Sequence, residues 1–276
     1  MPQMLKTGFI GLGNQGSPIA RQWVDAGFPL TIWARRPESL EPFVNTAAEI
    51  ANSPADLAQA CNLIGICVVN DADVRQVLLE AGVLEAMRPG SIIAIHSTLL
   101  PETVIELDKK ARSLGVHLLD APVSGGSHGA EAGTMTVMVG GDAHPLERVR
   151  AVFETFATKI AHLGPAGTGQ MMKLLNNNLA YANLVMGINA MELASQLGMD
   201  RDVAADVIRN SSGNSDGFGI LRNQDTLVKI SGPTSNLAKD VHHLVEVAEE
   251  AGCSDSELLE IAQSATRRLQ NYVATL

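Results

Sequence analysis

Two kinds of hydrophobic pattern alternate along the first 164 residues of the chain. Short runs that are almost wholly apolar predict strands, and longer amphipathic stretches between them predict helices. The strand-like runs are 8–10, 30–33, 63–69, 91–95, 116–119 and 134–139, and the helical stretches are 13–26, 54–60, 71–87 and 101–114. Uniformly apolar strands are typical of a parallel sheet that is covered on both faces. The pattern therefore predicts an α/β fold with a doubly wound parallel sheet.

The pattern changes after residue 164, where Gly164 and Pro165 interrupt the chain and only helical periodicity follows. The predicted helices are 169–197, 200–209, 236–251 and a last one from residue 254, with a turn-rich loop over 211–219. Ser254 and Glu257 have the spacing of a capping box, which would open the last helix. We expect two domains: an α/β domain over residues 1–164 and an all-helical domain over 165–276.

Composition narrows the class of protein. The chain has 276 residues, 46% hydrophobic and 18% charged, which is typical of a globular protein and excludes disorder. Its formal charge of −10 argues against a nucleic-acid partner, and no apolar stretch has the length of a membrane span. The three cysteines and seven histidines show no metal-ligand spacing, so we expect no metal. We expect a cytoplasmic protein with reduced cysteines.

A glycine-rich turn follows the first predicted strand and opens the first predicted helix. It has the form G-x-G-x-x-G and comprises Gly11, Leu12, Gly13, Asn14, Gln15 and Gly16. In such a turn the first glycine permits the sharp bend, the second admits a pyrophosphate, and the third lets helix and strand pack closely. The alternative is a tight turn without a ligand. The position between strand and helix favours a dinucleotide-binding Rossmann domain over residues 1–164.

The end of the second predicted strand indicates which dinucleotide is bound. An NAD-binding domain usually has Asp or Glu there to bind the ribose 2′-hydroxyl. This chain has Arg35 and Arg36 instead, and its first acid is Glu38. Two guanidinium groups suit a 2′-phosphate, although a solvated pair of arginines is the alternative. The sequence therefore predicts NADP(H), with NAD(H) possible.

Two later segments carry residues suited to catalysis. In residues 120–134, Ser124 and the N–H groups of Gly125 and Gly126 could bind a carboxylate, or the glycines could simply form a turn. In residues 167–177, Lys173 and Asn177 share one helix face. Lys173 lies in an apolar stretch, where desolvation favours the neutral amine that proton transfer requires. The alternative is a lysine whose stem covers apolar surface while its ammonium stays in water.

Four motifs in order resemble the β-hydroxyacid dehydrogenase family, which includes 3-hydroxyisobutyrate dehydrogenase and tartronate semialdehyde reductase. The resemblance covers the whole chain. It comprises the cofactor motif at 8–20, the substrate signature DAPVSGGSHGAEAGT at 120–134, the G-x-G-x-x-x-K-x-x-x-N motif at 167–177, and the pair Lys239-Asp240. Two positions depart from the family pattern: Gln15 replaces a usual Met, and His242-His243 follow the Lys-Asp pair. These histidines could face solvent or form part of a pocket wall.

The resemblance implies a role for each motif. Lys173 would be the general acid/base, and the substrate would be held by Ser124, Gly125, Gly126 and Asn177. The cofactor would meet Thr98, Val69 and Asn70 in the first domain and Lys239, oriented by Asp240, in the second. The implied reaction is reversible hydride transfer between NADP(H) and a small β-hydroxy acid or its semialdehyde. The implied partners are this small carboxylate and further copies of the chain, as a homodimer or homotetramer.

Two other functions are compatible with parts of this sequence. Imine reductases share the architecture and reduce imines with NADPH, but they generally have Asp or Tyr where this chain has Lys173. A non-catalytic dinucleotide-binding protein would be expected to lack Lys173 or Asn177, and this chain keeps both.

Overall fold

The computed structural model describes residues 5–232 and 235–274. The chain divides into two compact units, Met1–Lys173 and Leu174–Leu276, so the boundary falls within a long helix, α8 (Thr168–Gln196). The sequence predicts the domain boundary nearer residue 164, before this helix begins.

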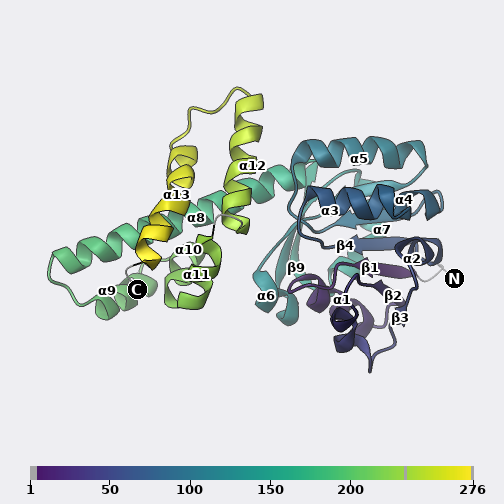
Figure 1. Cartoon of the computed structure of the whole chain (residues 1–276), viewed down its shortest axis with the longest axis horizontal. Helices are drawn as coiled ribbons and strands as arrows, with labels where there is room; N and C mark the ends of the chain where they lie inside the picture. Colours follow the sequence, from purple (N-terminus) through teal and green to yellow (C-terminus); the bar gives the residue numbers. More distant parts are fainter. Residues whose placement is uncertain (1–4, 233–234, 275–276) are drawn as a thin grey trace. The chain divides into compact units, whose positions relative to one another are not determined.

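One sheet forms the centre of the first unit (Figure 1). Its order is β3-β2-β1-β4-β5-β6-β8-β7, and β9 pairs with β8. The pairs from β3 to β6 are parallel, whereas β8 runs antiparallel to β6 and β7. The strands are β1 (Thr7–Ile10), β2 (Leu30–Trp33), β3 (Glu49–Ile50), β4 (Leu63–Ile66), β5 (Ile92–Ile95), β6 (His117–Asp120), β7 (Val123–Ser124), β8 (Met135–Gly140) and β9 (Ala157–Gly164). The predicted α/β fold with a mainly parallel sheet is confirmed.

Helices cover both faces of this sheet. Consecutive strand residues point to opposite faces, so the apolar strands have buried side chains on both. Phe9 packs with α1 (Gly16–Asp25), α6 (Gly126–Ala132) and α7 (Ala143–Phe153) on one face. Its neighbour Ile10 packs on the other face, where α5 lies close to α3 (Figure 1) and Glu106 forms an ion pair with Arg75. The helices of this second face are α2 (Pro54–Ala60), α3 (Asp71–Arg75), the π-helical turn η2 (Gln76–Glu80), α4 (Val83–Ala86) and α5 (Pro101–Ser113). A 3-10 helix, η1 (Pro37–Phe43), follows β2.

The second unit is helical, and no strand occurs in its described residues, 174–232 and 235–274. Beyond α8 it comprises α9 (Arg201–Arg209), α10 (Asp216–Gly219), η3 (Ile220–Arg222), α11 (Gln224–Ser231), α12 (Asn236–Glu250) and α13 (Glu257–Val273). Its main core joins Leu184 and Ile188 of α8 to Leu237 of α12 and Leu269 of α13. Among the described helices, none combines the length and apolarity of a membrane span.

Several local predictions are wrong. The strand predicted over 63–69 ends at Ile66, and the helix predicted over 71–87 is divided by the π-helical turn and by Gly82 in a left-handed conformation. The loop predicted over 211–219 contains α10. The capping box does not form, because the last helix begins after Ser256, where no side chain accepts a capping hydrogen bond.

Candidate active site

The glycine-rich turn joins β1 to α1 in a conformation that only small residues permit. Gly11 has φ +97°, and a Cβ there would collide with the carbonyl oxygen of Cys67 on the neighbouring chain segment. A Cβ on Gly16 would collide with the carbonyl oxygen of Gly11, so α1 packs closely against the turn. A Cβ on Gly13 would meet no atom within 4 Å. The space above Gly13 at the start of α1 fits a pyrophosphate held by helix N–H groups.

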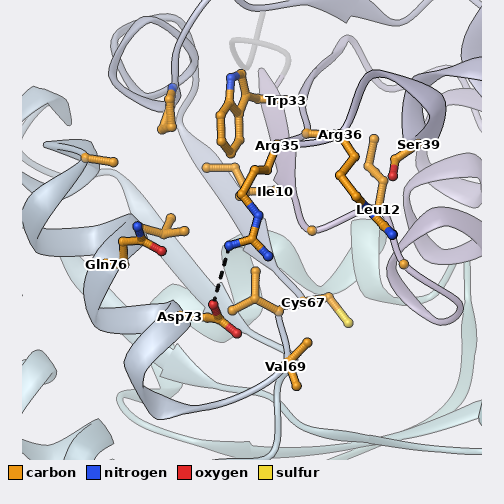
Figure 2. Close-up of a pocket in the computed structure, with 17 residues that line it drawn as sticks. Ile10, Leu12, Trp33, Arg35, Arg36, Ser39, Cys67, Val69, Asp73 and Gln76 are labelled. Carbon is orange, nitrogen blue, oxygen red and sulfur yellow. Dashed lines mark ion pairs between the residues drawn. The ribbon is translucent and has the colours of Figure 1, made fainter.

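A cavity of about 230 Å³ opens beside this turn (Figure 2). It combines six of the residues that the sequence predicts to bind the cofactor: Gly11, Leu12, Gly13, Arg35, Arg36 and Val69. The remaining lining residues are Ile10, Trp33, Ala34, Ser39, Pro54, Cys67, Val68, Asp73, Gln76, Val77 and Ala81. All lie at or after the carboxyl ends of β1, β2 and β4 or on the helices nearby, where open α/β sheets bind their ligands. The cavity therefore lies where a Rossmann domain binds part of its dinucleotide.

Two arginines of this cavity follow β2, and one of them faces the helix that follows β4. Arg35 extends toward Asp73 of α3, with Nη1 3.9 Å from Oδ1 (Figure 2). Arg36 lies beside Glu38, with Nε 3.7 Å from Oε1. The guanidinium side chains are 73% and 69% exposed, so an incoming anion can reach both of them.

The thiol of Cys67 also lines the cavity, and its ionisation bears on whether it could react there. Burial raises the pKa of this thiol to about 12. Cys67 is therefore a neutral apolar group at neutral pH, because the thiolate is the nucleophilic form.

The other predicted cofactor residues do not line this cavity. Asn14, Gln15 and Gly16 continue the turn into α1. Asn70 is the N-cap of α3, and its side-chain oxygen accepts a hydrogen bond from the N–H of Asp73 at 2.9 Å. Thr98 lies half-buried after β5, and Lys239 belongs to α12 of the second unit.

The predicted substrate segment begins at the end of β6 and leads into a short helix instead of remaining a loop. Ser124 is half-buried in β7 and pairs with Thr136 of β8. Gly125 and Gly126 have φ +134° and +63°, and Gly126 is the first residue of α6. Both glycines are exposed at the helix start, so their backbone N–H groups are accessible to an anion.

Asp120 connects this segment to the beginning of α8. Its carboxylate is fully buried and accepts hydrogen bonds from the backbone N–H groups of Gly167 and Gln170, each at 2.9 Å. The pKa of Asp120 is raised, because the effect of burial outweighs that of these and other backbone hydrogen bonds, which act to lower it. A Cβ on Gly169 would lie 2.8 Å from Asp120 Oδ2. The glycine thus permits the close approach by which Asp120 caps α8.

Gln170 fixes the same helix turn to the segment after β5. Its side-chain oxygen accepts a hydrogen bond from the N–H of Leu99 at 3.0 Å, and its Nε2 donates one to the carbonyl oxygen of Ser97 at 2.8 Å. Lys173 lies one turn later in α8 and is buried, with 8% of its surface exposed. The start of the helix that carries Lys173 is therefore held by side chains on both sides.

Asn177 belongs to the second unit, where it contacts α12. Its Nδ2 donates a hydrogen bond to Asp240 Oδ2 at 2.6 Å, and the other oxygen of Asp240 lies 3.8 Å from Lys239 Nζ. Burial and the nearby Asp240 raise the pKa of Tyr181. Asp240 of the Lys-Asp pair thus fixes the amide of Asn177.

The two histidines after this pair behave differently. The side chain of His242 is 71% exposed and lies 3.4 Å from Glu246, one turn further along α12. His243 is buried in the second unit. Of the two histidines, His242 therefore faces solvent and His243 does not.

Sequence reasoning missed Trp33, Ser39, Asp73 and Gln76 among the cavity residues. A partial signal existed, because β2 and β4 flank β1 and residues beyond their carboxyl ends must converge near the glycine turn. Nothing in the spacing of Asp73 or Gln76 distinguishes them from the solvated face of a helix.

Comparisons with known proteins identify the family to which both units of the chain correspond. Residues 6–164 match the family model for the NAD binding domain of 6-phosphogluconate dehydrogenase. Residues 167–274 match the model described as NAD-binding of NADP-dependent 3-hydroxyisobutyrate dehydrogenase. Together the two models span both predicted domains.

Individual relatives extend over nearly the whole chain. The NAD-dependent L-serine dehydrogenase of Pseudomonas aeruginosa is 33% identical over 276 residues, covering 96% of this chain and 92% of its own. The solved structure of Mycobacterium tuberculosis 3-hydroxyisobutyrate dehydrogenase with L-serine has a TM-score of 0.79 at 28% identity, covering 99% of this chain and 94% of its own. An imine reductase from Myxococcus stipitatus shares the fold, with a TM-score of 0.70 at 17% identity, covering 98% and 99% of the two chains. The chain therefore belongs to the β-hydroxyacid dehydrogenase family, whose members are nicotinamide-dinucleotide oxidoreductases.

Proposed function

We propose that this chain is an NADP(H)-dependent dehydrogenase of small β-hydroxy acids, or equally a reductase of the matching semialdehydes. The observation that carries the cofactor assignment is the cavity in which Arg35, Arg36 and Ser39 lie beside the glycine turn. Two guanidinium groups and a hydroxyl group are donors suited to a 2′-phosphate. The acid that would bind a ribose hydroxyl is missing from the end of β2, where Ala34 and Arg35 follow Trp33.

Lys173 is the proposed general acid/base. Its side chain is buried at the start of α8. As a neutral amine it would take the hydroxyl proton when the alcohol is oxidised. In the reverse direction its ammonium gives that proton to the forming alkoxide. The bound nicotinamide supplies or accepts the hydride. Asp120 and Gln170 position Lys173 by fixing the first turn of α8.

The proposed substrate is a short hydroxy acid with a free carboxylate. Ser124 and the N–H groups of Gly125 and Gly126 would bind the carboxylate, and Asn177, held by Asp240, would orient it. L-Serine belongs in the test set because it appears in the name of one relative and beside another in its crystal structure. L-Serine and 3-hydroxyisobutyrate both have a carboxylate and a primary hydroxyl group on the β-carbon.

The first experiment is a substrate panel run with both cofactors. It contains 3-hydroxyisobutyrate, L-serine, glycerate, the matching small semialdehydes and a cyclic imine. We expect turnover of a hydroxy acid or semialdehyde with a higher kcat/KM for the NADP(H) form. Turnover confined to the cyclic imine would contradict the proposed substrate class and favour imine reduction. Absence of turnover with all compounds, with cofactor binding intact, would favour a binding protein.

A second experiment tests the cofactor assignment. Replacing Arg35 by Gln removes the charge that a 2′-phosphate would contact, so the Kd for NADPH should rise about 10-fold or more, as expected when a charge-assisted hydrogen bond is lost. The Kd for NADH should change less than about threefold. Arg21→Gln is the matched control, because Arg21 pairs with Asp25 on α1 and does not line the cavity. Equal weakening of both cofactors by Arg35→Gln would contradict the assignment to NADP(H).

A further inference from the structure

A carboxylate lies among the groups that surround the proposed phosphate site. Asp73 is an acidic residue that lines the cavity, and its Oδ1 lies 3.9 Å from Nη1 of Arg35 (Figure 2). Its side chain is 25% exposed, whereas that of Arg35 is 73% exposed. The cap from Asn70 holds the backbone of Asp73 in the first turn of α3. The carboxylate is therefore the more constrained partner, and Arg35 is the more accessible one.

This arrangement has opposite consequences for the two cofactors. A 2′-phosphate carries up to two negative charges, so it must displace Asp73 from Arg35 and tolerate the carboxylate nearby. The 2′-hydroxyl of NADH carries no charge and can donate a hydrogen bond to a carboxylate. Asp73 thus lowers the affinity for NADPH without lowering the affinity for NADH. The neighbouring Arg36–Glu38 pair does not have this effect to the same degree, because Glu38 does not line the cavity.

We propose that Asp73 is a specificity-determining residue that limits the preference for NADPH over NADH conferred by Arg35 and Arg36. The proposal rests on the proposed function above, in which Arg35 binds the 2′-phosphate. It gives the chain a cofactor site of intermediate selectivity, with cations after β2 and an opposing anion on α3.

The test is the variant Asp73→Asn, which keeps the shape of the side chain and removes its charge. Titration of the full chain with NADPH and with NADH, followed by cofactor fluorescence at low salt, gives both dissociation constants. We expect the Kd for NADPH to fall about 3- to 10-fold and the Kd for NADH to stay constant or rise, because only the phosphate is repelled. The gain should shrink in 0.5 M salt, where the charges are screened.

Glu80→Gln is the matched control. It changes the net charge by the same amount and lies on η2, close to Asp73 in sequence, but Glu80 does not line the cavity. Its Kd for NADPH should match that of the wild type. An equal gain in Glu80→Gln and Asp73→Asn would mean that net charge alone is responsible, which would overturn the role of Asp73.

The variant Arg35→Gln, alone and combined with Asp73→Asn, separates the assignment to NADP(H) from the role of Asp73. If Arg35→Gln weakens NADPH selectively while Asp73→Asn leaves the Kd for NADPH unchanged, the cofactor assignment holds and the role of Asp73 is refuted. If Arg35→Gln weakens both cofactors equally, the assignment to NADP(H) fails and the role of Asp73 fails with it. Non-additive effects in the double variant would support direct competition for Arg35.

Discussion

At the scale of single residues, His96 is a deeply buried titratable group outside the proposed site. It lies after β5 among the rings of Phe9, Trp23, Phe153 and Phe156, and only 2% of its surface is exposed. Its Nδ1 lies 2.8 Å from the carbonyl oxygen of Ala121, so the neutral ring must carry its proton on Nδ1. Within the described residues, Nε2 has no hydrogen-bond partner. Burial lowers the pKa of His96 to about 4.

This low pKa predicts a loss of stability in mild acid. Between the folded value of about 4 and the ordinary value of 6.5, the unfolded chain binds more protons than the folded one, so stability falls as the pH falls through this window. From pH 7.5 to pH 5 the contribution of His96 amounts to about 2 kcal/mol. The free energy of unfolding in urea should therefore fall more steeply in the wild type than in His96→Asn, whose amide can still donate to Ala121.

Phe153→Leu is the control, because it loosens the same aromatic cluster without removing a titratable group. It should show the pH dependence of the wild type at lower overall stability. The same pH dependence in His96→Asn as in the wild type would show that His96 does not titrate as inferred.

At the scale of secondary-structure elements, the decisive contact is between Asp120 and the beginning of α8. The buried carboxylate bonds two backbone N–H groups of the helix start, and Gly169 leaves it room. Since Lys173 lies in the next turn, the position of its side chain depends on this cap.

Replacing Gly169 by Ala should therefore damage both stability and turnover. The added Cβ would meet the carbonyl oxygen of Met138 at 2.5 Å and Asp120 Oδ2 at 2.8 Å. Overpacking of this kind costs about 1–3 kcal/mol, and the shifted helix start should lower kcat more than it raises KM for the cofactor. Gly219→Ala is the control, because its Cβ would meet no atom within 4 Å. Thermal unfolding and steady-state kinetics measure both effects, and wild-type values for Gly169→Ala would refute the importance of the cap.

The sequence correctly predicts those elements in which the pattern of apolar and polar residues follows the pattern of buried and exposed positions. The helix predicted over 54–60 and the strand predicted over 30–33 match the structure. It fails for β9, whose residues are mostly half-buried or exposed, and for α6, where glycines indicate a turn. The strand predicted over 63–69 is too long because Val69, 67% exposed, is an apolar residue of the cavity and not of the sheet.

Within the cavity, the motif residues Gly11 and Gly13 are found from sequence because their spacing reflects the turn itself. Asp73 and Ser39 are not found, since their roles depend on the neighbours that the sheet order brings to them. The roles of Lys173, Asn177 and Ser124 stay predictions.

At the scale of the whole molecule, the second unit has an exposed apolar surface that a further copy of the chain could cover. Val203 and Val207 of α9 are 63% and 58% exposed, and Leu197 and Met199 beside them are 64% and 55% exposed. These residues line a cavity of about 450 Å³, and among its described lining residues Asp200 alone is charged. Such clusters mark protein interfaces in soluble proteins.

This surface predicts a homo-oligomer whose subunit interface includes α9. Light scattering coupled to size-exclusion chromatography should show a dimer or tetramer for the wild type and a smaller species for the double variant Val203→Glu, Val207→Glu. Val44→Glu is the control, because Val44 is 72% exposed on the first unit. A monomeric wild type at about 50 μM, or an unchanged double variant, would contradict the prediction.

Lys173 is proposed to move the proton in a nicotinamide-dependent oxidation or reduction. The most direct measurement is the single-turnover rate of Lys173→Met with NADP(H) prebound and the best substrate of the panel, next to Lys159→Met on the exposed part of β9 as a control. We expect Lys173→Met to react about 10²- to 10⁴-fold more slowly with the Kd for the cofactor nearly unchanged, and Lys159→Met to react like the wild type. A Lys173→Met rate within about threefold of the wild type, with cofactor bound, would contradict the claim.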